Sequence, residues 1–149
     1  MMKYSIGEVA SITGITISTL RYYDREGLFP NMERGNGGIR RFNEAEMESL
    51  RIIECLKNSG LSIKAIKLFL DWCQEGDSTL EERRELFYER LGVVEKQIEE
   101  LQKTMNTLRF KCWYYDTAVS FGSEKALKDL NPDKIPEDVL KYKVDDCLD

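Results

Sequence analysis

The sequence predicts a mainly α-helical protein, in which a winged helix-turn-helix head is followed by one long dimerising coiled-coil helix. Two observations carry this prediction. Between Thr16 and Phe42, a short capped helix is followed by a glycine turn that has arginines on both sides. Between Leu80 and Val119, apolar residues recur with the seven-residue spacing of a coiled coil. The expected domains are the winged helix-turn-helix head at 1–73, a linker at 74–79, the dimerisation helix at 80–120 and a tail at 121–149 with one or two small helices.

Composition limits the class of protein. The chain has 149 residues, enough for one modest core and a separate extended element. It has no apolar run near the roughly 20 residues that a membrane span needs. Its N-terminus lacks the apolar stretch of a secretory signal, so we expect a cytoplasmic protein.

The net charge of −5 is unevenly distributed. Residues 1–72 contain ten Lys and Arg against nine Asp and Glu, and residues 73–149 contain twelve against eighteen. The acidic excess therefore lies in the C-terminal half. Within residues 1–43 the balance is six basic against four acidic side chains, which permits contact with phosphates but does not require it.

The chain contains no histidine, which excludes Ser-His-Asp and Cys-His catalysis and every zinc site that needs a histidine ligand. Its four cysteines form no C-x-x-C pair, and it has no glycine-rich phosphate loop. We therefore expect no catalytic residues, no metal site and no cofactor. The cysteines are Cys55, Cys73, Cys112 and Cys147.

The N-terminal segment predicts two short helices. Ser5 and Glu8 match a capping box, which places a helix start at Ser5. Gly14 ends that helix and Thr16 caps the next, which should stop near Gly27. Two short helices joined by a glycine-containing turn are the helix-turn-helix pattern. The apolar face expected for the first helix is Ile6, Val9, Ala10 and Ile12.

The second helix and the hairpin after it carry the candidate DNA contacts. Leu20 and Tyr23 should face inward, which leaves polar side chains of the second helix outward. Ser and Thr hydroxyls can bond base edges or phosphates, and Arg and Tyr can hold phosphates. The hairpin turn at Asn36–Gly38 adds three arginines. The candidate DNA-binding residues are Thr16, Ser18, Thr19, Arg21, Tyr22, Arg34, Arg40 and Arg41.

Two further helices should support this head. Asn43 is a plausible cap for a helix that ends at Gly60, and Ser62 caps the next. Their apolar faces complete the expected core. These faces are Met47, Leu50, Ile53 and Leu56 in the first helix, and Ile63, Ile66, Phe69 and Leu70 in the second.

The clearest periodicity lies beyond residue 80. Apolar positions alternate spacings of four and three without interruption, and Gly92 lies outside them. A helix near 60 Å long, at about 1.5 Å per residue, cannot bury this seam on a small head, so we expect a partner chain. The alternative is a long helix folded back on its own domain. The seam is Phe87, Leu91, Val94, Ile98, Leu101, Met105, Leu108, Cys112, Tyr115 and Val119. The last residues, 144–149, are expected to fray.

The order of these motifs over residues 3–119 resembles the MerR family of bacterial transcription regulators. The likeness rests on Arg21–Tyr23, Gly27–Leu28, the wing at Gly38–Phe42 and the long seam helix. It implies a homodimer joined by an antiparallel coiled coil, bound to an inverted-repeat operator in double-stranded promoter DNA. Regulation would come from bending and untwisting the DNA, which affects RNA polymerase indirectly through the promoter. On this chain, the resemblance implies base reading by Ser18 and Thr19, and phosphate contacts by Arg21, Tyr22 and the wing arginines.

The signal is harder to predict. The segment around Cys55 resembles the branch of the family that responds to aldehydes and other thiol-reactive electrophiles, which would be a stress response. Arg51 and Lys57 are near in sequence, and positive charge favours the thiolate. The alternative is that Cys55 is a small buried hydrophobic residue in an apolar helix. A second class of function also stays open, namely a coiled-coil adaptor that binds protein and has no sequence-specific DNA binding.

Overall fold

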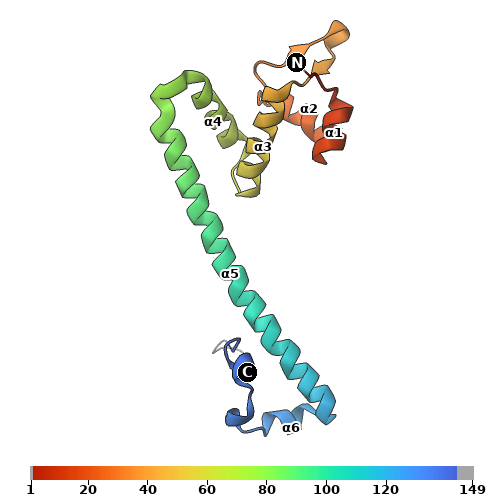
Figure 1. The fold of residues 1–149 in the computed structure, drawn as a ribbon, viewed down its shortest axis with the longest axis vertical. Coiled ribbons are helices and arrows are strands. Elements are labelled where there is room, and N and C mark those ends of the chain that lie inside the picture. The colour runs from red at the N-terminus through yellow and green to blue at the C-terminus, as the bar shows by residue number, and fades with distance from the viewer. Residues whose placement is uncertain (1, 144–149) are drawn as a thin grey trace. The chain divides into compact units, whose positions relative to one another are not determined.

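A computed structural model of the chain describes residues 2–143. It consists of helices and one small hairpin, and it divides into two compact units, Met1–Gly92 and Val93–Asp149. None of the described helices is long and apolar enough to cross a membrane. The α-helices and strands are α1 (Ile6–Thr13), α2 (Ile17–Arg25), β1 (Glu33–Arg34), β2 (Arg40–Arg41), α3 (Glu44–Asn58), α4 (Ile63–Glu75), α5 (Leu80–Phe121), α6 (Glu124–Lys128) and α7 (Glu137–Leu140) (Figure 1).

The caps predicted for α1 and α2 are confirmed. The Ser5 backbone N–H donates to Glu8 Oε2 at 2.7 Å, and Ser5 Oγ accepts from the Glu8 N–H at 3.3 Å. The bond from the Ser5 backbone lowers the pKa of the Glu8 carboxyl. Thr16 Oγ1 accepts from the Thr19 N–H at 3.2 Å, and Gly14, between the helices, has a φ of 75°. The helix-turn-helix is thus fixed by the local bonds that its sequence specifies.

The end of α2 depends on Gly27. This residue has a φ of 79°, and the Leu28 N–H donates to the Tyr23 carbonyl at 3.0 Å. The two features are those of a Schellman turn, in which a left-handed residue lets the chain bond back across the last helical turn. The predicted stop at Gly27 is therefore confirmed, with the last helical residue at Arg25.

The predicted hairpin is also present. Strands β1 and β2 pair antiparallel, with Glu33 opposite Arg41 and Arg34 opposite Arg40. The connection spans residues 35–39 and contains a 3₁₀ turn at Asn36–Gly38, so it is wider than the tight turn that the glycines suggest. A bridge between Tyr4 and Phe42 joins the N-terminus to the base of this wing.

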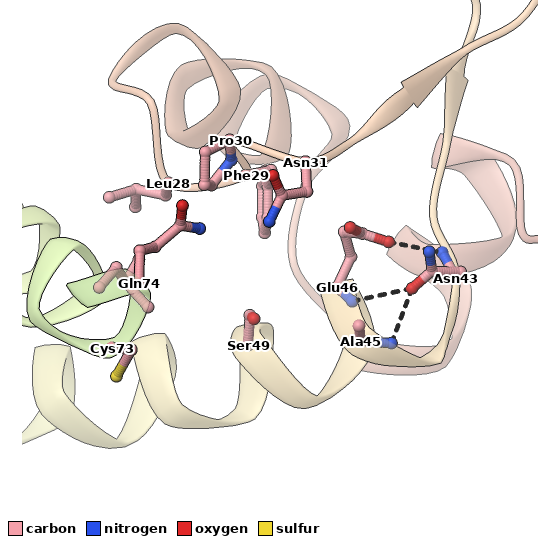
Figure 2. A pocket seen from close by; sticks show the side chains of 11 residues that line it. Leu28, Phe29, Pro30, Asn31, Asn43, Ala45, Glu46, Ser49, Cys73 and Gln74 are labelled. Atoms are coloured by element: carbon pink, nitrogen blue, oxygen red, sulfur yellow. Dashed lines mark hydrogen bonds between the residues drawn. The ribbon is translucent and has the colours of Figure 1, made fainter. Parts of the chain in front are cut away.

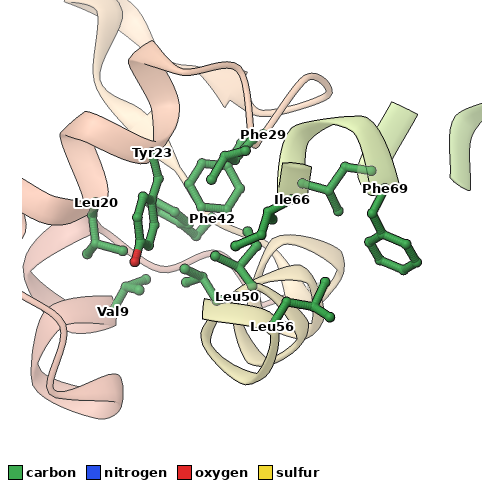
Figure 3. Packing of buried hydrophobic residues seen from close by; sticks show 12 residues of the cluster. Val9, Leu20, Tyr23, Phe29, Phe42, Leu50, Leu56, Ile66 and Phe69 are labelled. Atoms are coloured by element: carbon green, nitrogen blue, oxygen red, sulfur yellow. The ribbon is translucent and has the colours of Figure 1, made fainter. Parts of the chain in front are cut away.

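The core of the first unit lies among α1, α2, α3, α4 and the base of the wing (Figure 3). Phe29 and Phe42 pack edge to face with ring centroids 5.4 Å apart. The inward positions predicted from periodicity are confirmed, with one correction. Ile12 is 60% exposed, because the buried face of α1 follows the helical spacing of Ile6, Val9 and Thr13, and Ile12 lies off that face. The buried hydrophobic residues of this core are Val9, Leu20, Tyr23, Leu28, Phe29, Phe42, Leu50, Ile53, Leu56, Ile66, Phe69 and Leu70.

The stretch between α4 and α5 is an ordered turn. Gly76–Thr79 forms a 3₁₀ helix, and the buried Thr79 hydroxyl donates to the Trp72 carbonyl at 2.6 Å. Arg83 Nη2 donates to the Gly76 carbonyl at 2.8 Å. The start of α5 packs on α4, since the rings of Phe69 and Phe87 meet edge to face at 5.4 Å. The first compact unit accordingly continues to Gly92.

The predicted long helix is confirmed as one uninterrupted helix, α5, from Leu80 to Phe121. All ten seam residues lie on it, and all except the half-buried Val94 are exposed in the single chain. Leu101 is 68% exposed and Ile98 61%. Beyond Val94, the seam is therefore not buried within the single chain.

The second unit contains its own small apolar cluster. Phe110 and Ala118 on α5 are buried, as are Leu127 on α6 and Val139 on α7. The Arg109 guanidinium lies 5.3 Å from the ring centroid of Tyr142, so the segment after α6 turns back alongside α5 (Figure 1). The fraying expected at 144–149, and Cys147 with it, lies outside the described residues.

Candidate nucleic-acid interface

The outward face of α2 presents a group of hydroxyls. Thr16 and Ser18 are exposed and Thr19 is half-buried. Thr16 Oγ1 lies 3.2 Å from Ser18 Oγ and 2.8 Å from Thr19 Oγ1, in addition to capping the helix. Thr16 is thus committed mainly to the start of α2, whereas Ser18 offers a freer hydroxyl. Arg21 follows on the same helix and is exposed.

The two adjacent tyrosines of α2 have opposite environments. Tyr22 is 40% exposed, whereas Tyr23 is 1% exposed. The Tyr23 hydroxyl donates to Glu54 Oε1 at 2.7 Å, and Lys57 Nζ lies 5.6 Å from its ring centroid. Burial raises the pKa of Tyr23 above its usual value. Core packing is therefore the role of Tyr23, and Tyr22 is the tyrosine available to a ligand.

The wing brings the other candidate residues close to α2. Arg34 Nη2 donates to Asp24 Oδ2 at 2.8 Å, and Arg40 Nε donates to the same oxygen at 2.7 Å. Arg41, opposite Glu33 in the hairpin, is exposed. Two of the predicted wing arginines are thus bonded directly to α2, the helix that carries the other candidate residues. Asp24 was missed by sequence reasoning, and its one signal is that it is the only acidic side chain within α2.

A hollow of about 490 Å³ lies between the loop after α2 and helices α3 and α4 (Figure 2). None of the candidate DNA contacts lines it. Its one carboxylate, Glu46, is 6% exposed and accepts from the Asn43 N–H at 2.9 Å as part of the cap of α3. With its charged group engaged in this way, the hollow offers no charged anchor for a ligand.

Cys55 is exposed on α3, so the reading of this residue as a buried hydrophobe is wrong for the single chain. The two cations near it in sequence are directed elsewhere. Arg51 Nη1 bonds Glu48 Oε2 at 2.8 Å, and Lys57 lies over the Tyr23 ring. The thiol is therefore accessible, and neither Arg51 nor Lys57 directs its charge toward it. Within residues 2–143 no three His, Cys, Asp or Glu residues form a group that could hold a metal ion.

Comparison with known proteins places this geometry in context. Residues 4–72 match the family model for MerR helix-turn-helix regulatory proteins, and residues 47–109 match a MerR DNA-binding model. An uncharacterized HTH-type transcriptional regulator of Haemophilus influenzae is 41% identical over 91% of this chain and 98% of its own length. The regulator AdhR of Bacillus subtilis is 40% identical over 55% of this chain and 59% of its own.

Among solved structures, the chain is similar to HiNmlR, described as a MerR family regulator lacking the sensor domain and bound to promoter DNA. The two share 42% identity with a TM-score of 0.76, over 84% of this chain and 99% of HiNmlR. The similarity therefore extends well beyond the helix-turn-helix head.

Proposed function

The chain belongs to the MerR family of helix-turn-helix regulatory proteins and is a DNA-binding transcription regulator, and on this basis we propose how it binds and controls a promoter. It acts in the cytoplasm as a homodimer on an inverted-repeat operator. It changes transcription by distorting the DNA between promoter elements, and it reaches RNA polymerase only through that distortion. The relative HiNmlR, bound to promoter DNA at 42% identity, supports the choice of target.

The head residues divide into two roles in this proposal. Ser18 and Thr19 of α2 read base edges in the major groove, and Arg21, Tyr22, Arg34, Arg40 and Arg41 hold phosphates. Support comes from the exposure of Ser18, Arg21, Tyr22 and Arg41, together with the ion pairs that join the wing to α2. Thr16 contributes by fixing the start of α2 and with it the direction of the hydroxyls that follow.

The observation that best supports the proposed dimer is the exposed seam of α5. A continuous apolar stripe on a helix from Leu80 to Phe121 stays in water in the single chain, at a cost of about 25 cal/mol for each Å² of apolar surface. Pairing with a second copy removes that surface from water. An antiparallel pair separates the two heads along the coiled coil, which suits two half-sites of one duplex.

A mobility-shift titration with the DNA beside the protein's own coding region tests this proposal. We expect one retarded species on a duplex with both half-sites, which survives moderate salt better than binding to a shuffled duplex. A duplex with one half-site should bind far more weakly. Equal, weak retention of all three duplexes would contradict the proposal and favour the adaptor alternative.

The signal proposed for this regulator is a thiol-reactive electrophile that adds to the Sγ atom of Cys55. Its exposure on α3 supports access to this thiol. The position also supports an effect on DNA binding, because Glu54, one residue earlier, bonds Tyr23 of α2. Modification at this point of α3 would disturb the contact that holds the reading helix in place.

A further inference from the structure

The wing contains a pair of like charges whose repulsion is relieved by a neighbouring side chain. Arg34 and Arg40 are directly opposite each other across the two-stranded sheet. Like charges in such a pair destabilise a hairpin, and a ladder of two residue pairs has little else to hold it. A sequence chosen only for hairpin stability would not place two arginines there.

One carboxylate relieves this repulsion. Asp24 Oδ2 accepts from Arg40 Nε at 2.7 Å and from Arg34 Nη2 at 2.8 Å. The Asp24 side chain is 6% exposed, whereas Arg40 is 23% and Arg34 is 52% exposed. The acid therefore lies beneath the arginines, and the guanidinium groups extend from it toward solvent. A carboxylate with two charge-assisted bonds fixes both partners more firmly than a surface ion pair would.

The bonds leave the arginines able to bind a second anion. Arg40 uses its Nε atom on Asp24, and the two Nη atoms carry further N–H donors. Arg34 uses only Nη2. Two guanidinium groups and one carboxylate carry a net charge of +1, which attracts a phosphate. Since Asp24 belongs to α2, these donors are held at a fixed position relative to the Ser18 hydroxyl on the same helix.

We propose that Asp24 is a positioning residue for DNA recognition. It holds Arg34 and Arg40 so that the wing binds a phosphate of the DNA backbone only when α2 is in register with the bases of that DNA. This inference rests on the proposed DNA contacts of α2 and the wing. It assigns to an acidic residue a favourable role in binding a polyanion. The reason is geometric: phosphate contacts set the register in which bases are read.

The competing role for Asp24 is charge competition, in which the carboxylate merely occupies arginines that DNA would otherwise use. The two roles differ in the measured specificity ratio. Loss of a competitor strengthens binding to every duplex alike. Loss of a positioning group weakens the cognate duplex, whereas the removed negative charge leaves binding to unrelated DNA equal or tighter.

The test uses Asp24→Asn in the full-length protein, with Glu33→Gln as the matched control. Glu33 also lies on the wing and loses one negative charge, but its carboxylate bonds Lys3 and neither of these arginines. Binding constants are measured on a duplex selected by the wild-type protein from a randomised library, and on a shuffled duplex of equal composition. We expect Asp24→Asn to lower the ratio of the two affinities about tenfold, or about 1.4 kcal/mol, and Glu33→Gln to preserve it.

A ratio that Asp24→Asn leaves within twofold of the wild-type value overturns the inference, whichever way the absolute affinities move. Thermal unfolding of each variant identifies a folding defect. If Asp24→Asn does not fold, Arg40→Lys is the second variant, because lysine keeps the charge and lacks the guanidinium that bridges Asp24 and a phosphate. An unchanged ratio in Arg40→Lys then overturns the inference. A wild-type protein that fails to discriminate between the duplexes would instead contradict the proposed contacts of α2 and the wing.

Discussion

The hydroxyl of Tyr23 donates a 2.7 Å hydrogen bond to Glu54 Oε1, which ties α2 to the supporting helix α3. Tyr23 is 1% exposed, so its hydroxyl has little access to water in place of this bond. Loss of the hydroxyl should therefore affect the stability of the head and not only its surface chemistry.

Tyr23→Phe should lower the free energy of unfolding by about 1 kcal/mol, the usual net value of a buried hydrogen bond. Because burial raises the pKa of Tyr23, the unfolded chain loses the phenol proton first, near pH 10. In the wild type, the contribution of Tyr23 to the free energy of unfolding is thus constant below that pH and declines as the pH rises further. Urea unfolding at pH 8 and pH 11 checks both effects. Between these two pH values, the free energy of unfolding should fall less for Tyr23→Phe than for the wild type.

Tyr22→Phe is the matched control, since Tyr22 is 40% exposed and has no such bond among the described residues. Its urea midpoint should match the wild type at both pH values. An equal decline with pH in the wild type and in Tyr23→Phe would contradict the assignment of this dependence to Tyr23.

Gly27→Ala should destabilise the head by about 1–2 kcal/mol. Gly27 has a φ of +79°, and a Cβ there would lie 2.9 Å from Lys67 Cε. Gly7→Ala is the control, because Gly7 lies within α1 with nothing within 4 Å of an added Cβ, and alanine favours a helix. Thermal melting should rank Gly7→Ala at or above the wild type and Gly27→Ala clearly below it. The reverse order would refute the geometry of this turn.

Leu101→Glu should convert the proposed dimer to a monomer. Leu101 lies near the middle of the seam and is 68% exposed in the single chain, so a charge there would be buried only on pairing. Gln102→Glu adds the same charge one position away, outside the seam, and should leave the dimer intact. Sedimentation equilibrium measures both masses. A dimer of undiminished affinity in Leu101→Glu would rule out this seam.

Cys55→Ser should abolish the response to a thiol-reactive aldehyde while leaving DNA binding in its absence unchanged. Cys73→Ser is the control, because Cys73 is likewise exposed. Transcription from a promoter that carries the selected duplex sequence should change severalfold with aldehyde for the wild type and Cys73→Ser, and stay constant for Cys55→Ser. An undiminished response in Cys55→Ser would exclude this thiol as the sensor.

Much of the fold follows from short-range patterns in the sequence. The caps at Ser5, Thr16, Asn43 and Ser62 are all present, because each depends on residues within one helical turn. The long helix could equally be predicted from the sequence, since the seam spacing is sustained from Phe87 to Val119 within α5. The exposure of Cys55 could also have been inferred, because Leu56 and Ile53 define the buried face and Cys55 lies off it.

The features that sequence reasoning missed depend on contacts between distant segments. Asp24 acquires its partners only because the hairpin register places Arg34 opposite Arg40. The burial of Phe110 was hidden for a different reason. The strong seven-residue period of the seam obscures a second, shorter apolar stripe on another face of the same helix, which only the fold of the tail makes visible.

That second stripe affects how many chains can assemble. Phe110 and Ala118 are buried within the C-terminal unit, as are Leu127 and Val139 of the segment after α5. A chain cut after Phe121 would expose this stripe as well as the seam, so that α5 would carry two exposed apolar surfaces in place of one. In the proposed dimer, the segment after α5 therefore keeps these residues out of water and leaves the seam as the apolar face of α5 available for pairing.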